Sequence, residues 1–344
     1  MENYISDFTK TGLKIILCVF FMSWIASCGS IDKGSSSPST SALSYVQPLI
    51  NNGVCGEGKG IYRRTVFASP QIEFSKATRD FVRQIGVEDA DEVESVRENI
   101  GKPNHVGAQN FTGILLRRVA IGAFFSANAN LMAFKDPNYG GLETIDAEVT
   151  ENVGMTFTLA EQFGKSWMVG VTGKYLQRGR GGVVASVADS EAATEQFQDT
   201  DSLLGQGTGP GADLGVLWKG KGRSKPTFGV LVANVGDTSI IAEEETDQNL
   251  NLKQTVNAGV TIAPGTKFSR VRLLLDVRDI LGQVQENDRK KVHIGGELTV
   301  RDAFGITTGL NQGSPTFGVY GDLWLMRFDA GMYTQEIGER VGKR

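Results

Sequence analysis

Histidine, cysteine and long apolar runs are scarce in this chain of 344 residues, and each of these scarcities excludes some classes of protein function. The two histidines, His105 and His293, would need carboxylates to hold zinc, and the spacing around them suggests no such site. The 35 basic and 39 acidic residues give a net charge of -4, far from the basicity of a nucleic-acid binder. We therefore expect no metal, no cofactor and no nucleic-acid partner.

Signatures of catalysis are missing as well. No GxSxG nucleophile elbow occurs in a strand–turn–helix context, and the glycine-rich stretch 205–215 lacks the Lys-Ser/Thr of a phosphate-binding loop. We expect no enzymatic activity and no catalytic residue. Beyond the first thirty residues, nothing approaches the ~20 apolar residues of a transmembrane helix. A membrane-spanning β-barrel is not excluded, because half of its strand residues are polar.

The N-terminus has the organisation of an exported protein. Lys10 and Lys14 precede an apolar run at 15–22, which has the size of a signal-peptide core. The following sequence IASC, ending at Cys28, resembles the lipobox of bacterial lipoproteins, which implies an acylated Cys28 as the mature N-terminus. Cleavage near Ala26 without a lipid is the alternative. Cys55 would then be the one cysteine left for a disulfide, so none can form within the mature chain.

Three segments follow from this organisation. We expect a signal peptide with a lipobox at 1–27, a flexible Ser-rich linker at 28–58 and a β-barrel at 59–340. Gly is frequent at 43 residues and Pro rare at 9, a balance that suits bent, tightly packed strands better than Pro-rich linkers.

Alternation of apolar and polar residues is the main structural signal. In SRVRLLLDVRD, one face carries Val271, Leu273, Leu275 and Val277, and the opposite face is charged apart from Leu274. A period of two is typical of amphipathic strands. The same pattern occurs at 119–134, 145–159, 255–262, 293–300, 303–311 and 326–333. These segments exceed the ~5–6 residues of soluble strands and suit the ~9–11 residues that cross a bilayer at a tilt.

The polar faces of these strands supply the candidate lumen-facing residues. They are Arg270, Arg272, Asp276, Arg278, His293, Glu297, Arg327 and Asp329. The basic ones, together with Lys174 and Arg178, have two interpretations. They line a channel that binds carboxylates, or they form ion pairs across strands with Glu297, Asp276 and Asp329. The ion-pair interpretation is favoured, because large barrels need such pairs in any case.

Two long polar loops, at 179–211 and 236–253, stand among short turns, and this matches the one-sided loops of outer-membrane barrels. The charged segment 75–102 lacks alternation and has apolar residues at roughly helical spacing. We predict a short helical insertion there, divided at Gly86, that lies outside the barrel or plugs its lumen.

The C-terminal stretch 307–340 is similar to the end of FadL-like outer-membrane barrels, especially the TraF-like branch with its PorV-like cousins. The matching residues are Gly309, Asn311, Gln312, Gly313, Gly318, Tyr333, Glu336 and Gly338. The phrase LVANVGDT at 231–238 also looks like a turn that recurs in this family. Two departures are the missing Asn–Pro–Ala–Gly phrase near the start and the missing final strand with a C-terminal aromatic residue.

The resemblance implies an antiparallel transmembrane β-barrel of about 12–14 strands in the outer membrane of a Gram-negative bacterium, lipid-anchored through Cys28. It implies contact with outer-membrane lipid and a passive route for hydrophobic small molecules, or an accessory role in surface export. The alternative is a non-transporting scaffold that docks a secretion or conjugation apparatus.

Overall fold

Strands that neighbour in sequence also neighbour in space throughout this protein. The computed structural model describes residues 65–75, 78, 103–116, 118–136, 142–186, 205–222, 224–243, 249–264, 269–283, 288–301, 303–311, 313–323 and 326–332. These residues form one antiparallel sheet of 14 strands, which confirms the predicted all-β class and strand number. The expected signal peptide and linker, with Cys28, lie outside the described residues.

The first strands are long and the later ones are short. They are β1 (Thr65–Phe74), β2 (Pro103–Leu115), β3 (Val119–Asp136), β4 (Leu142–Phe163), β5 (Trp167–Ser186), β6 (Gly205–Lys219), β7 (Thr227–Ala233), β8 (Ile241–Ala242), β9 (Thr255–Ile262), β10 (Ser269–Val277), β11 (Val292–Val300), β12 (Phe304–Asn311), β13 (Ser314–Leu323) and β14 (Met326–Met332). A short helix, α7 (Asp288–Lys291), precedes β11. None of the described helices has the length and hydropathy needed to cross a membrane.

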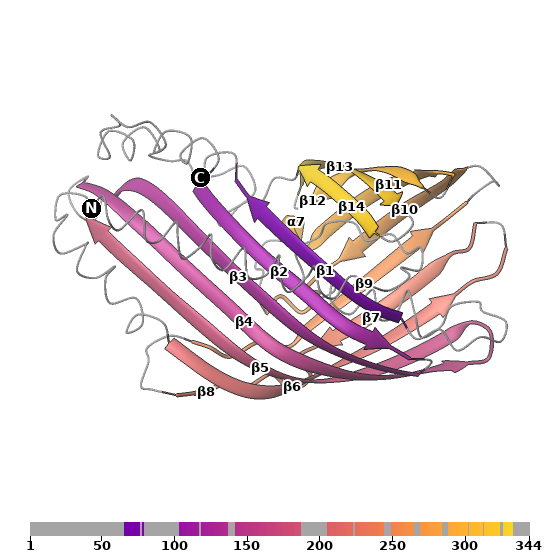
Figure 1. Ribbon diagram of the computed structural model, residues 1–344, viewed down its shortest axis with the longest axis horizontal. Coiled ribbons are helices and arrows are strands. Elements are labelled where there is room, and N and C mark those ends of the chain that lie inside the picture. Colours follow the sequence, from indigo (N-terminus) through magenta and orange to yellow (C-terminus); the bar gives the residue numbers. More distant parts are fainter. Residues whose placement is uncertain are drawn as a thin grey trace.

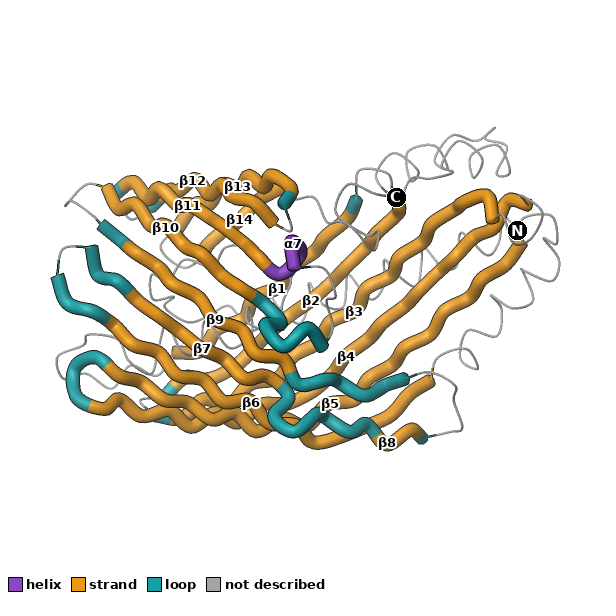
Figure 2. Tube along the Cα trace, turned by 180° about the vertical axis from the view of Figure 1, so that it is seen from behind, coloured by secondary structure: helices purple, strands orange, loops and turns teal. Residues whose placement is uncertain are grey.

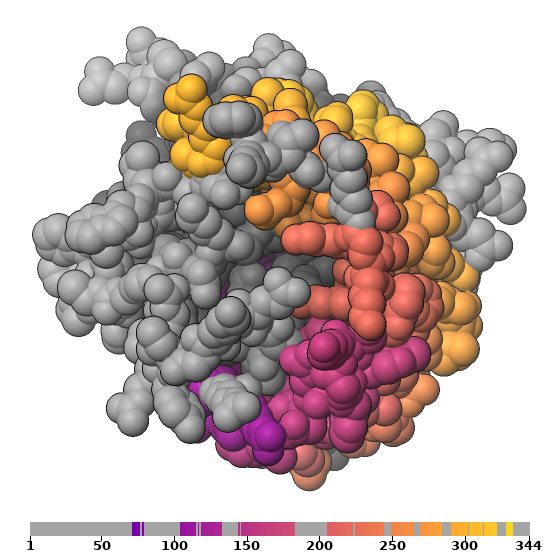
Figure 3. Space-filling view, turned by 90° about the vertical axis from the view of Figure 1, so that its right-hand side faces the viewer, coloured from indigo at the N-terminus to yellow at the C-terminus, as the bar shows by residue number. Residues whose placement is uncertain are grey.

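The sheet is strongly curved but open. In Figures 1 and 2 the strands β1 to β5 slant one way across the view and β7 and β9 slant the other way, and Figure 3 shows the strands following an arc from magenta to yellow. The order runs from β1 to β7 and from β9 to β14, with β8 beside β6, and β1 and β14 have no pairing with each other within the described residues. Without β8, thirteen strands form the meander. Because all neighbours are antiparallel, β1 and β14 run in the same direction, so a direct pairing of these edges would be parallel.

Connections differ in length between the two ends of the sheet. At the end that we call the short-turn end they are 116–118, 164–166, 220–226, 263–268, 301–303 and 324–325. At the opposite, long-loop end they are 75–102, 137–141, 187–204, 234–254, 278–291 and 312–313. The predicted one-sided arrangement of loops is therefore present, with two short connections at the long-loop end.

The predicted bounds of the loop at 179–211 are wrong at both ends, because the connection between β5 and β6 covers only 187–204. β5 continues to Ser186 and β6 begins at Gly205, so Gly179 and Gly211 lie inside paired strands. The glycines that suggested a loop are strand glycines, and their missing side chains leave space that neighbouring chain segments occupy. The predicted loop at 236–253 likewise contains β8 and buried apolar residues, described below.

Candidate functional site: an apolar and a polar face

One face of the sheet, which we call the apolar face, exposes a wide band of large apolar side chains. Val271, Leu273 and Leu275 of β10 are 38, 48 and 40% exposed, on the side that alternation predicted. The same face carries Ile121, Val153, Met155, Phe157, Leu159, Val171, Ile294, Leu298, Ile306, Phe317 and Val319, all exposed. A contiguous exposed apolar surface of this extent is typical of contact with a membrane or a partner.

A row of four aromatic residues borders this band at the short-turn end. Phe163 pairs with Trp167, Trp167 with Trp218, and Trp218 with Phe228, one residue from each of β4 to β7. Phe163, Trp167 and Phe228 are about half exposed. Such a row has the position and chemistry of the aromatic girdles found where barrels meet the membrane–water interface.

The opposite limit of the band is marked by Tyr175 of β5, which lies on the apolar face and is 58% exposed. From Trp167 to Tyr175 the strand rises about 26 Å at ~3.3 Å per residue. At a tilt of ~40° this is a height of about 20 Å, close to the ~25 Å apolar band of outer-membrane barrels. Beyond Tyr175 the face becomes polar at Gln177, so β5 continues well past the band.

The opposite face, the polar face, carries most of the predicted lumen-facing residues. Register pairs Arg272 with Glu297, Asp276 with His293, and Arg270 with Thr299. Glu297 and His293 are each 6% exposed, whereas Arg270 at the strand end is exposed. Asp329 on β14 is exposed and pairs with Tyr320. The side chain of Arg327 lies outside the described part of the chain.

Glu297 is the centre of a buried polar cluster. Arg272 Nη1 lies 3.3 Å from Glu297 Oε2, and the Tyr320 hydroxyl donates to Oε1 at 2.8 Å. Thr299 Oγ1 also donates to Oε1, at 3.0 Å. These three donors satisfy the hydrogen-bonding capacity of a carboxylate that is removed from water. The cluster brings together the predicted Arg272 and Glu297 with two residues that sequence reasoning missed.

Tyr320 was missed because its place depends on a glycine of another strand. Its ring lies over Gly305, the residue opposite it on β12, where a Cβ would lie 2.1 Å from the ring. Phe124 covers Gly154 on β4 in the same way. An aromatic ring that fills the gap above a cross-strand glycine pins the register of the two strands.

Most of the predicted basic residues form ion pairs. Lys174 Nζ lies 2.7 Å from Asp213 Oδ1, and Arg278 Nε lies 3.2 Å from Asp276 Oδ2. With Arg272 bound to Glu297, these contacts agree with the favoured ion-pair interpretation. The buried Nε of Arg178 has no hydrogen-bond partner in the described part of the chain, which leaves this residue as the best candidate for the channel interpretation.

The two ends of the charged segment 75–102 meet on the polar face at the long-loop end. Ser75 N donates to the His105 carbonyl at 2.8 Å, and His105 N donates to Thr78 Oγ1 at 2.9 Å. Ser75 Oγ accepts from Thr78 N at 3.0 Å, which is the geometry of a helix N-cap, and Thr78 is helical. Thr78 is the one residue of the predicted insertion described as helical, residues 79–102 lie outside the described residues, and the helical insertion stays a prediction.

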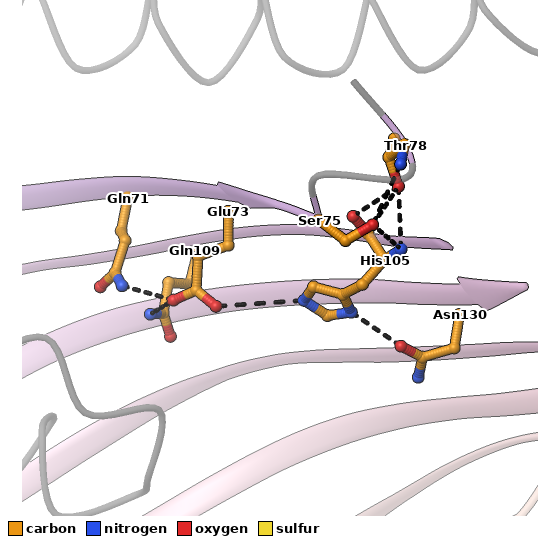
Figure 4. A network of polar contacts seen from close by, with 7 residues as sticks. All are labelled: Gln71, Glu73, Ser75, Thr78, His105, Gln109 and Asn130. Atoms are coloured by element: carbon orange, nitrogen blue, oxygen red, sulfur yellow. Dashed lines mark hydrogen bonds and ion pairs between the residues drawn. The ribbon is translucent and has the colours of Figure 1, made fainter. Parts of the chain in front are cut away.

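A polar network runs along the wall beside this junction (Figure 4). His105 Nδ1 lies 2.7 Å from Asn130 Oδ1, and its Nε2 lies 4.0 Å from Glu73 Oε2. Glu73 also accepts from Gln71 and, at 3.4 Å, from Gln109. The Ser75 hydroxyl contacts Thr78 and the backbone of His105, not the imidazole, so this Ser-His-Glu set lacks the geometry of a nucleophile and its base.

Among the residues that the structure describes, neither histidine belongs to a cluster of metal ligands. Within the described ranges, no group of three or more His, Cys, Asp or Glu side chains could hold a metal ion. The absence of metal and of enzymatic activity stays a prediction from the sequence.

Comparisons with known proteins leave the family open. No family model matches the chain, and no curated protein matches it, so the FadL-like resemblance has no support beyond the residues quoted above. A solved structure of CdiB from Acinetobacter baumannii is similar over 65% of this chain, with 10% identity and a TM-score of 0.32. The match spans 48% of that protein. At this level the similarity assigns no function.

Proposed function

We propose that the chain spans the outer membrane of a Gram-negative bacterium as a β-barrel, with the apolar face toward lipid and the polar face inward. The observation that carries this proposal is the aromatic row at Phe163, Trp167, Trp218 and Phe228, which borders an exposed apolar band of membrane height. The buried charges of the opposite face support it, because a hydrated interior tolerates paired charges that lipid does not.

The loops supply an orientation. Outer-membrane barrels have short periplasmic turns and long external loops, so the short-turn end faces the periplasm. β1 begins at this end, where Thr65 pairs with Leu115 next to a short turn. A chain that is anchored through an acylated Cys28 would enter the wall from the periplasmic side, and this agrees with the predicted lipid anchor.

Two finer functions follow from the resemblance, and both are non-enzymatic. A FadL-like passive route for hydrophobic small molecules rests on the resemblance alone, because Ile240 and Leu250 fill the apolar cluster on the polar face. An accessory or docking role in surface export is supported by the long connections gathered at one end. The charged wall around the cluster favours the docking role, because hydrophobic cargo would meet ion pairs along most of its path.

Fractionation and uptake test these proposals in sequence. The full-length protein should sediment with outer membranes and show a heat-modifiable band on gels, and a soluble periplasmic product would refute the barrel. Liposomes that contain the purified protein should then take up labelled fatty acid if the protein provides a route for hydrophobic molecules. Empty liposomes are the control. Uptake equal to that control, together with co-purification of export proteins, would support docking.

A further inference from the structure

The connection between β7 and β9 folds back on itself as a hairpin. Thr238 N donates to the Leu252 carbonyl at 2.8 Å, and Leu252 N donates to the Thr238 carbonyl at 3.0 Å. Ile240 N donates to Asn251 Oδ1 at 2.9 Å. We call residues 237–243 and 249–253 the inner hairpin. Its β8 pairs with the edge of β6 beyond the end of β7 (Figure 2).

Glycines on β6 let the inner hairpin lie directly on the polar face. Gly207, Gly209 and Gly211 occupy alternate positions of β6, so their missing side chains all point to one face. A Cβ at Gly209 would lie 2.1 Å from the Ser239 carbonyl oxygen, and one at Gly207 would lie 2.6 Å from that of Ile241. Backbone atoms cannot move aside as a flexible side chain can. The glycine-rich stretch 205–215, which lacks the residues of a phosphate-binding loop, therefore provides the surface on which the inner hairpin packs.

An apolar core fastens the inner hairpin to the wall. Ile240 and Leu250 are 9 and 3% exposed and pack with Leu176 of β5, and Phe124 of β3 adds to the cluster. Phe124, Gly154, Leu176 and Gly209 stand opposite one another on β3, β4, β5 and β6. The cluster therefore follows a single row across four strands, and the two glycines of this row make room for it.

The base of the inner hairpin is held by a tight turn. Asn234, Gly236 and Asp237 have φ of 53°, 73° and 63°, a left-handed conformation that these residue types tolerate. Asp213 accepts from Asn234 N at 2.8 Å while it pairs with Lys174. This turn is the LVANVGDT phrase of the sequence, and its Asn and Asp now have a structural role.

Asp237 closes the base from the other strand of the hairpin. Its carboxylate accepts from Gln254 N at 2.6 Å and from Lys253 Nζ at 3.2 Å. The Gln254 hydrogen bond and the Lys253 ammonium lower the pKa of this carboxyl below its ordinary value. Gln254 Oε1 in turn accepts from Gly236 N at 2.8 Å, so both strands of the hairpin are tied to the turn.

The other side of the inner hairpin is mainly polar, with Ile241, 74% exposed, as its apolar exception. Ser239, Asn249, Asn251 and Lys253 are exposed and point away from the apolar cluster. If the wall forms a barrel, as proposed above, this side faces the lumen. Leu176 follows Tyr175, the outer limit of the apolar band, so the hairpin lies at the level of the outer rim. We infer that the inner hairpin is a fixed constriction of a water-filled passage, beside which ions and small polar solutes cross the membrane.

Matched glycine substitutions test this inference. Gly209→Val introduces side-chain atoms where the hairpin backbone lies and should lift the hairpin from the wall. Gly173→Val is the control, because Gly173 belongs to β5, faces the apolar side and has nothing within 4 Å of a Cβ. A second variant, Ile240→Ser with Leu250→Ser, weakens the apolar contact of the hairpin without changing a residue of β1 to β7 or β9 to β14. Single-channel conductance in planar bilayers is measured for all four proteins with KCl.

A release of the hairpin should raise conductance by about twofold, because the narrowest part of a pore limits its current. Leu250→Cys, in a Cys55→Ser background, should become reactive to a membrane-impermeant maleimide in the Gly209→Val protein and stay protected in the Gly173→Val protein. Equal conductance and labelling in all heat-modifiable variants would overturn the constriction and leave the barrel intact. Loss of the fold in both hairpin variants would overturn it too, since the hairpin would then be part of the wall's stability.

If even the wild-type protein is neither heat-modifiable nor conducting, the proposed barrel fails. That outcome differs from a failure of the constriction alone, in which wild type and variants conduct alike.

Discussion

Two adjacent leucines of β10 test the membrane orientation directly. Leu273 is 48% exposed on the apolar face, whereas Leu274 is half-buried on the polar face and fills the space above Gly295, 2.9 Å from where a Cβ would be. Against lipid, Leu273→Arg should cost about 2–4 kcal/mol near the midplane. Leu274→Arg should cost roughly 1 kcal/mol, because the leucine is only half-buried and the arginine stem still covers the glycine.

A water-soluble sheet predicts the opposite order. An exposed Leu273 could become arginine within about 0.5 kcal/mol, the ordinary range of surface substitutions, and Leu274→Arg would be the costlier change. The assay is the free energy of unfolding by guanidinium in lipid vesicles, monitored by tryptophan fluorescence. If Leu274→Arg destabilises the protein more than Leu273→Arg, the apolar face does not contact lipid and the reasoning fails.

Four further predictions concern other parts of the chain. Cys28→Ala should leave an unprocessed precursor, and mass spectrometry that finds an unmodified mature N-terminus in the wild type would contradict the lipid anchor. Deletion of 76–102 with a glycine bridge should leave a heat-modifiable barrel, with higher conductance if the segment is a plug and lost partner binding if it docks outside; an unfolded product contradicts both. Arg272→Gln should cost about 1–3 kcal/mol in vesicle unfolding, because Glu297 stays buried without its cation, and an unchanged stability would refute this pairing. The pKa of the Asp237 carboxyl is lower in the folded than in the unfolded chain, so this group stabilises the hairpin above the unfolded pKa. That stabilisation is lost as the pH falls through the folded pKa, and protease cleavage of the inner hairpin in the wild type should therefore increase below about pH 4. Cleavage of the Asp237→Asn protein should vary less with pH.

The alternation in β10 predicted which side chains share a face, and the structure agrees for Val271, Leu273 and Leu275. This succeeds because successive side chains of a strand point to opposite sides whatever their neighbours are. The turn at 301–303 is also local, since Arg301 takes a positive φ of 52° between two strands that sequence pattern already defined. The ion pair of Arg272 followed once the polar face was known, because a charge on that face needs a partner.

The partners themselves depend on which strands lie side by side and in what register. Tyr320 reaches Glu297 because it stands opposite Gly305, a pairing that no single strand reveals. The sequence predicts a polar loop at the inner hairpin, because Ile240 and Leu250 are among a small number of apolar residues in a segment that is mostly polar and charged. Only the tertiary structure decided their burial, since the glycines of β6 leave room for a chain segment and Leu176 and Phe124 supply the apolar surface against which it packs. Side-chain direction is a property of the local backbone, whereas a filled gap is a property of two segments that meet only after folding.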